Sequence, residues 1–303
     1  MNATDRYSAA GGQAGTVSMA AFTILAWSSI FPVTRWALQW FSPFELVTLR
    51  LMTAALVMAL VLLWIRPPLP SPRQFAVLAL CAVLGVALYN VLLSWGLVTL
   101  SAGAASFLTN SIPIFTCIIS VAVNGERMSP RTIAGTLVAF LGIAILASGQ
   151  PGGLTFGSGA TLVLTASVCS AFYIVIQRRL VHQLTPLETG SWLFILGALA
   201  MLPFSFGAFK AAASAPLWPL AVVALLAIIP GALGQIAWLR VLRQMPAGRA
   251  ASLLYLIPPL ATGLGVLLLG ETVSVRLIAG GALAIAGVAL VNGIRPRRIG
   301  NPL

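Results

Sequence analysis

The stretch GAASFLTNSIPIFTCIISVAVNGERMSPRTIAGTLVAFLGIAILASG, residues 103–149, decides the fold because the chain contains it twice. A shift of 145 positions places it on residues 248–294 without a gap. A shared apolar composition would give scattered matches, whereas here glycine, proline and charged residues match in one register. Among the identical pairs are Gly103 and Gly248, Pro113 and Pro258, Gly125 and Gly270, Glu126 and Glu271, Arg131 and Arg276, and Gly142 and Gly287. The repeat unit is therefore half of the protein.

The composition is that of a membrane protein. The 303 residues are 59% hydrophobic and 7% charged, with a mean hydropathy of +1.02, whereas about a quarter of a soluble domain is charged. The net charge of +12 does not indicate a nucleic-acid partner, because the basic residues lie in loops between apolar runs. We expect the lipid bilayer to be the partner. Cys81, Cys117 and Cys169 lie inside apolar runs without metal-ligand spacing, so we expect small buried hydrophobes and no metal site.

Ten apolar segments follow one another, each near the roughly 20 residues that cross a bilayer. The predicted spans are 17–38, 43–65, 74–97, 101–123, 130–148, 158–179, 187–207, 217–239, 247–269 and 273–294. The predicted fold is an all-α membrane protein of ten transmembrane helices. Its parts are a disordered N-terminal tail (1–16), a first five-helix repeat (17–149), a second one (158–294) and a C-terminal tail (295–303).

The arginines predict the orientation, because ten spans place both termini on one side. That side carries Arg6, Arg66, Arg73, Arg127, Arg131, Arg178, Arg179, Arg240, Arg243, Arg249, Arg295, Arg297 and Arg298. The opposite side has Arg35, Lys210 and Arg276, and Arg50 lies inside the second span. Cytoplasmic loops are enriched in Lys and Arg, so both termini are predicted to be cytoplasmic.

An odd number of spans per repeat means that the second copy enters the membrane upside down. Glu126 is then cytoplasmic and its repeat equivalent Glu271 lies on the outer side. A shift of 143 further pairs Arg35 with Arg178, Pro43 with Pro186 and Glu45 with Glu188. Inverted repeats of this kind are typical of secondary transporters, whose substrate sites lie near the midplane on interrupted helices.

Three motifs carry a family resemblance: Ala26-Trp27-Ser28-Ser29, Pro43 followed by Arg50, and the doubled Pro, Gly-Glu, Gly block. They resemble the EamA type of the drug/metabolite transporter superfamily, and the sequence is most similar to its YddG-type amino-acid exporters. The resemblance implies a central cavity lined mainly by spans 1, 3, 4, 6, 8 and 9. It also implies export of small metabolites across a bacterial inner (plasma) membrane. Many relatives have Gly where this chain has Ser28, so local packing could differ there.

Paired prolines interrupt two spans at equivalent depth. Pro113 and Pro258 fall near the middle of spans 4 and 9, and Pro259 follows directly. A proline within a helix removes a backbone hydrogen bond and kinks the helix. Asn110 and Tyr255, which are repeat equivalents, stand three residues before the first proline of each span. The pattern could mark a substrate site or gate, or ordinary kinks in a helical bundle.

Further polar and aromatic residues could line the cavity. They are Trp27, Ser28, Tyr89, Asn90, Asn110, Tyr173, Gln235 and Tyr255. Aromatic walls with a few amide and hydroxyl groups suit a zwitterionic or aromatic metabolite, although each residue could equally pack in the core. Arg50 could bind a substrate carboxylate, or it could reach outward or bond to backbone carbonyls and Glu45.

What the sequence lacks narrows the function class. The five acidic residues, Asp5, Glu45, Glu126, Glu188 and Glu271, fall at span ends or in the tail, and the one histidine, His182, falls in a loop. A proton-coupled carrier keeps a carboxylate or histidine at depth, so facilitated diffusion or exchange is expected. Neither an ATP-binding motif nor a catalytic set occurs, so the chain is predicted not to be an enzyme and to need no cofactor.

The prediction is thus a secondary transporter that exports small metabolites, above all amino acids including aromatic ones, by alternating access. It would act as a monomer or weak homo-oligomer on a small-molecule substrate. A drug or dye efflux carrier is the first alternative, and a channel or non-transporting membrane protein is the second. The sequence encodes neither the substrate identity nor the direction of net transport.

Overall fold

The computed structural model describes residues 3–124, 130–148, 157–177, 180, 183–244 and 254–292, and every regular element in these ranges is a helix. Five helices are long and apolar enough to cross a membrane: Gly15–Ala37, Pro43–Ile65, Pro72–Leu97, Ser158–Gln177 and Leu217–Trp238. Leu187–Ala200 and Leu202–Ser214, bent by 49°, form a sixth candidate span. Shorter apolar helices lie at Ile133–Gly142, Ile257–Leu269 and Val275–Gly287. The protein is therefore an all-α membrane protein.

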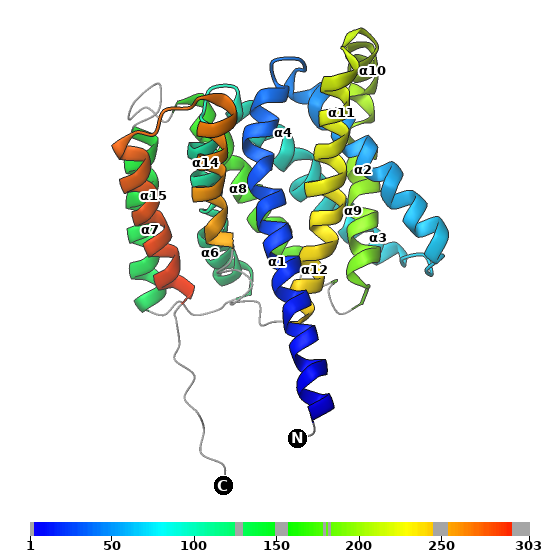
Figure 1. The fold of residues 1–303 in the computed structure, drawn as a ribbon, viewed down its shortest axis with the longest axis horizontal. Coiled ribbons are helices and arrows are strands. Elements are labelled where there is room, and N and C mark those ends of the chain that lie inside the picture. The colour runs from blue at the N-terminus through cyan, green and yellow to red at the C-terminus, as the bar shows by residue number, and fades with distance from the viewer. Residues whose placement is uncertain are drawn as a thin grey trace.

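The first half contains two unbroken helices followed by segmented ones (Figure 1). Its elements are α1 (Ala3–Ala37), α2 (Pro43–Ile65), α3 (Pro72–Cys81), the π-helix η1 (Ala82–Leu88), α4 (Tyr89–Leu97), α5 (Ala102–Thr109), α6 (Ile112–Asn124) and α7 (Pro130–Ser148). The α1 helix begins at Ala3, so most of the segment 1–16 is helical, whereas the sequence predicted disorder there. This segment contains four alanines and no proline, which favours a helix, whereas its three glycines disfavour one.

The second half has the same order of spans, except that the equivalent of α2 is bent between α9 and α10. Its elements are α8 (Ser158–Gln177), α9 (Pro186–Ala200), the 3₁₀ helix η2 (Leu202–Phe204), α10 (Ser205–Ser214), α11 (Leu217–Leu226), the π-helix η3 (Ala227–Leu233), α12 (Gly234–Gln244), the 3₁₀ helix η4 (Leu254–Leu256), α14 (Ile257–Leu269) and α15 (Val275–Asn292). The start of α1 and the end of α15 lie at the same face of the bundle (Figure 1).

Local capping signals explain where α2 and α9 begin. Ser42 forms a capping box with Glu45, and Thr185 forms one with Glu188; a proline follows each cap residue. Each box satisfies backbone N–H groups that have no partner within the helix, and proline suits the first helical position. The two boxes are related by the 143-residue shift that the sequence predicted.

The helices α7 and α15 are repeat equivalents and pack directly against each other. A Cβ atom added to Gly142 would collide with the backbone of Ala284, and one added to Gly287 would collide with the backbone of Ala139. Ala139 corresponds to Ala284 and Gly142 to Gly287, so exchange of the two halves maps this contact onto itself. The pairing also means that the two helices run antiparallel, as an inverted repeat requires. Small residues allow this close approach of helices in a membrane.

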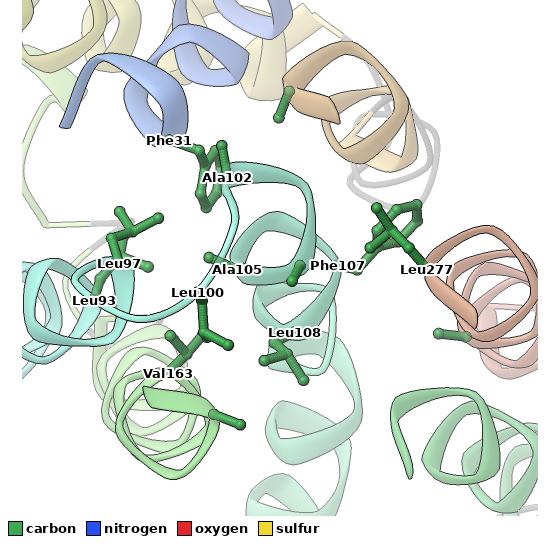
Figure 2. Close-up of a cluster of buried hydrophobic side chains, with 14 of the residues drawn as sticks. Phe31, Leu93, Leu97, Leu100, Ala102, Ala105, Phe107, Leu108, Val163 and Leu277 are labelled. Carbon is green, nitrogen blue, oxygen red and sulfur yellow. The ribbon is translucent and has the colours of Figure 1, made fainter. Parts of the chain in front are cut away.

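The main buried cluster surrounds the short helix α5 (Figure 2). Ala102, Ala105 and Leu108 of α5 are buried among side chains of α1, α4, α8, α14 and α15. Phe107 lies against α15, where a Cβ on Gly281 would collide with its ring. The first half of span 4 is thus held on all sides, which fixes the position of the break that follows it.

Candidate functional site

Span 4 is interrupted, and span 9 has non-α backbone at the equivalent positions. In span 4 the helix ends at Thr109 and restarts at Ile112, one residue before Pro113. In span 9 the 3₁₀ turn η4 leads into α14, where Pro258 and Pro259 occupy the first turn. The gap residue Asn110 is the repeat equivalent of Tyr255, which lies in η4. Each half therefore contributes non-α backbone at one place, and in a membrane such backbone must be buried in protein or face water.

Two π-helical segments form a second symmetric pair, which the sequence analysis missed. The 145-residue shift maps η1 (Ala82–Leu88) onto η3 (Ala227–Leu233). Gly85 in η1 corresponds to Pro230 in η3, and the identical pairs, Ala82 with Ala227, Ala87 with Ala232 and Leu88 with Leu233, are common helix residues that do not mark a π-helix. Glycine and proline both disfavour regular α-helix, and this was the available signal. Such π-segments occur frequently at functional sites.

An aromatic side chain from the opposite half packs against each π-segment. Trp27 of α1 donates a hydrogen bond from Nε1 to the carbonyl of Pro230 in η3, at 3.0 Å. Tyr173 of α8 lies against η1, because a Cβ on Gly85 would collide with its ring. Trp27 also contacts Trp238 of α12, with ring centroids 5.4 Å apart. The first and sixth spans thus touch the π-segments of the eighth and third.

The remaining predicted cavity residues divide by their surroundings. Tyr89, Asn90, Asn110, Tyr173 and Gln235 are partly exposed. The amide nitrogens of Asn90 and Asn110 donate to the carbonyls of Val86 and Ser106, at 2.7 and 3.2 Å.

Ser28 and the prolines differ from those residues. Ser28 is fully buried, and its hydroxyl donates to the Ile24 carbonyl at 2.6 Å. Pro258 is buried and Pro259 is exposed. The side chains of Pro113 and Tyr255 lie outside the described part of the chain, as do Glu126, Arg178, His182 and the predicted tail 295–303.

Arg50 of α2 is buried, with 7% of its surface exposed. Its Nη1 lies 3.5 Å from the Thr34 hydroxyl of α1, and its buried Nε has no partner. The helix α4, which begins at Tyr89, packs against α2. Arg50 therefore does not reach outward. The Glu45 carboxylate accepts a hydrogen bond from the Ser42 backbone N–H, at 2.8 Å.

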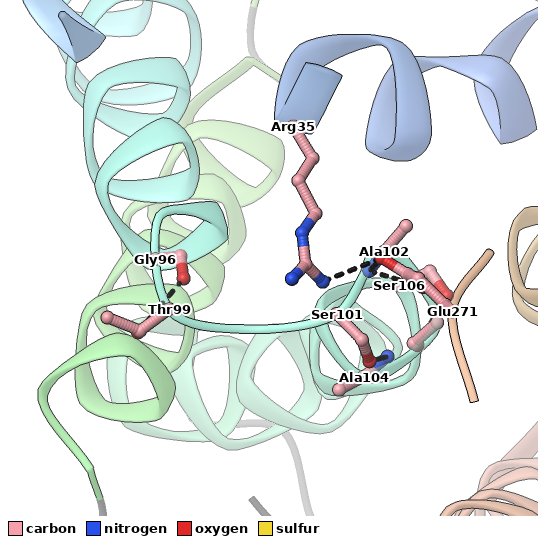
Figure 3. Close-up of polar contacts among 9 residues, drawn as sticks. Arg35, Gly96, Thr99, Ser101, Ala102, Ala104, Ser106 and Glu271 are labelled. Atoms are coloured by element: carbon pink, nitrogen blue, oxygen red, sulfur yellow. Dashed lines mark hydrogen bonds and ion pairs between the residues drawn. The ribbon is translucent and has the colours of Figure 1, made fainter. Parts of the chain in front are cut away.

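One cluster of charges joins three elements at the end of the bundle opposite to the start of α1 (Figures 1 and 3). Arg35 of α1 and Glu271 form a salt bridge of 2.6 Å. The Glu271 carboxylate also accepts the Ala102 N–H of α5, at 3.0 and 3.1 Å to its two oxygens. Anions are favoured at a helix N-terminus, so this carboxylate holds α1 and α5 together.

A cavity of about 310 Å³ lies beside this cluster, lined by Arg35, Leu38, Gln39, Leu97, Val98, Leu269 and Glu271. A second cavity of about 290 Å³ is apolar and lies between α2 and α9. Neither cavity contains a predicted cavity residue. Over the residues that the structure describes, no three His, Cys, Asp or Glu side chains are grouped as a metal site requires.

Comparison with known proteins decides the family. The EamA-like transporter family matches twice, at residues 15–148 and 157–293. The chain belongs to the EamA-like transporter family. This confirms the resemblance predicted from the doubled block, and it makes this EamA protein a membrane transporter and not an enzyme.

Curated relatives that are named as transporters or exporters match this EamA protein over nearly their whole length. A "Probable terminal-alkyne amino-acid exporter" of Streptantibioticus cattleyicolor is 32% identical over 270 residues, which cover 89% of this chain and 91% of the relative. An "Uncharacterized transporter" of Archaeoglobus fulgidus is 26% identical, covering 89% and 96%. The "Uncharacterized transporter YdfC" of Bacillus subtilis is 27% identical, covering 86% of each chain.

A solved crystal structure has the same fold. It superposes with a TM-score of 0.63 at 20% sequence identity, over 95% of this chain and 98% of the other. At this identity the likeness concerns the fold alone.

Proposed function

We propose that this EamA protein is a ten-helix secondary transporter that exports amino acids, aromatic ones included, from the cytoplasm of a bacterium across its inner membrane. The observation that carries the proposal is the non-α backbone at equivalent positions of spans 4 and 9, together with the paired π-segments η1 and η3. Two symmetric sets of irregular backbone, one from each half, suit alternating access, in which the inverted repeats move against each other around a central site, and a simple pore needs no such pairing. The amino-acid class is supported by the relative from Streptantibioticus cattleyicolor, whose name carries it.

In this proposal both termini are cytoplasmic, and the cavity lies between the two π-segments. Trp27, Tyr89, Asn90, Asn110, Tyr173, Gln235 and Tyr255 line it, and Pro113, Pro258 and Pro259 keep the helices irregular. Ser28 does not contact the substrate in this proposal, because it is fully buried and its hydroxyl is already bonded within α1. The protein works as a monomer or a weak homo-oligomer.

Transport proceeds by facilitated diffusion or exchange. Glu45, Glu188 and Glu271, the acidic residues whose side chains the structure describes, all lie at helix ends and all accept backbone N–H groups there. None is placed at depth, where a proton relay would need it. Collapsing an imposed pH gradient should leave efflux from proteoliposomes unchanged. Accumulation driven by that gradient would show that the proposed coupling is wrong.

Counterflow in proteoliposomes tests the function itself. Vesicles preloaded with unlabelled phenylalanine should take up labelled phenylalanine, and this uptake should fall in Trp27→Ala and Asn110→Ala. Trp64→Ala is the matched control, because Trp64 is 85% exposed at the end of α2. Exchange of a cationic dye without any amino-acid signal would instead assign the protein to drug efflux. Uptake that needs no preloaded solute and does not saturate would indicate a channel.

A further inference from the structure

Arg50 lies deep inside its span, where a positive charge needs a counter-charge. Arg50 is the eighth residue of α2, so it lies about 10 Å inside the helix start at 1.5 Å per residue. Its neighbours Val47 and Leu51 pack in a buried apolar cluster with Ala87, Val91 and Ala198. A guanidinium at such depth is costly unless it is paired or faces a polar interior.

The described part of the chain provides little compensation for this charge. A guanidinium has five N–H donors, yet the one hydrogen-bond partner identified for Arg50 is the Thr34 hydroxyl at 3.5 Å, which is a long contact. The Nε–H group is buried without a partner. The carboxylates of Glu45, Glu188 and Glu271 are held at helix ends, as described above. The site therefore has unused donor capacity and an unbalanced positive charge.

The groups around Arg50 belong to the proposed cavity. Thr34 is buried on α1 and lies seven residues after Trp27, which places both on the same face of that helix, about 10 Å apart. Tyr89 begins α4 directly after η1, and Asn90 follows it. A small molecule between Arg50 and Trp27 would thus meet a cation and hydroxyl groups at one end and aromatic rings at the other.

We propose that Arg50 binds the carboxylate of the transported molecule, assisted by the hydroxyl groups of Thr34 and Tyr89. This inference rests on the proposed function and narrows its substrates to small molecules that carry a carboxylate. A planar guanidinium can hold a carboxylate through two parallel hydrogen bonds, which an ammonium group cannot do. The bound carboxylate supplies the negative charge that the described part of the chain does not place beside Arg50. Substrate amides and cationic dyes are excluded because they leave Arg50 uncompensated.

The test combines transport with a binding readout on the purified full-length protein. Wild-type vesicles should exchange phenylalanine and not phenylalaninamide. Arg50→Gln should lower phenylalanine exchange about 10- to 100-fold, as expected for the loss of a hydrogen bond to a charged group. Arg50→Lys should recover part of the activity. Lys210→Gln is the matched control, since Lys210 is an exposed cation on α10, and it should exchange phenylalanine like the wild type.

Thermal unfolding distinguishes loss of binding from loss of folding. Arg50→Met should melt at or above the wild-type temperature without substrate, because an unpaired buried charge is removed. Phenylalanine should raise the melting temperature of the wild type and not that of Arg50→Met. Phenylalanine exchange that persists in Arg50→Gln, or equal exchange of the amide, overturns this inference and leaves the proposed function intact. Wild-type vesicles that exchange dyes and no amino acid overturn both.

Discussion

Arg35 and Glu271 are separated by 236 positions and form a salt bridge of 2.6 Å. The same carboxylate accepts the backbone N–H of Ala102, at the start of α5. Glu271 therefore ties the end of α1 and the start of α5 to the end of α14. Arg35 is 33% exposed and Glu271 10% exposed, so solvent screens part of the interaction energy.

Glu271→Ala should destabilise the protein by about 1–2 kcal/mol, because it removes the ion pair and the acceptor for Ala102. Glu271→Gln should destabilise it less, since the amide oxygen still accepts that N–H group. The measurement is thermal unfolding of Arg35→Gln, Glu271→Gln and the double variant in one detergent. A double-mutant cycle isolates the pair, and strictly additive effects would show that Arg35 and Glu271 do not interact.

Gly142→Ala and Gly287→Ala should each destabilise the bundle by about 1–3 kcal/mol, the usual range for overpacking. The added methyl group meets backbone of the partner helix, and backbone cannot rotate away as a side chain can. Gly263→Ala is the control, because nothing lies within 4 Å of a Cβ atom there. A lower melting temperature in Gly263→Ala than in Gly142→Ala would contradict the close packing of α7 on α15.

Trp27→Phe should destabilise the protein by about 1 kcal/mol and slow phenylalanine counterflow. The phenyl ring keeps the aromatic surface but cannot donate a hydrogen bond, so the Pro230 carbonyl in η3 loses the indole donor. Trp64→Phe makes the same substitution on an exposed ring and should have no measurable effect on stability or on phenylalanine counterflow. If both variants behave alike, the hydrogen bond to η3 has no role in transport.

Ser28→Ala should change the apparent affinity for phenylalanine less than twofold. The Ser28 hydroxyl is buried and donates within its own helix, and the Ile24 carbonyl can retain its backbone hydrogen bond without it. Asn110→Ala is the comparison, since this amide is partly exposed at the break of span 4. Concentration dependence of counterflow measures both variants, and a larger loss in Ser28→Ala would place its hydroxyl in contact with substrate.

Features that depend on neighbouring residues in the chain were predictable. The capping boxes of Ser42 and Thr185 follow from short motifs, and their relation follows from the 143-residue shift. The π-segments were missed because their identical pairs are alanine and leucine, which occur in any helix, and because the residues that disfavour regular helix, Gly85 and Pro230, differ. Sequence identity detects a shared residue, whereas here the two halves share a backbone conformation.

Features that depend on distant parts of the chain could not be predicted. The depth of Arg50 followed from its place in span 2, but periodicity does not reveal which side chains surround it. The contact of Glu271 with Ala102 joins the end of one span to the start of another. Such pairings depend on how whole helices pack, and a single sequence contains no direct record of them.

The contact between α7 and α15 has a consequence for the origin of the chain. Gly142 meets Ala284 in the same way as Gly287 meets Ala139, so either half offers both sides of the interface. Two separate copies of one half, inserted in opposite directions, would present complementary surfaces without any change of sequence at these positions. The single polypeptide thus has the geometry of an antiparallel homodimer, in which a covalent link now fixes the orientation that two free subunits would have to find by encounter.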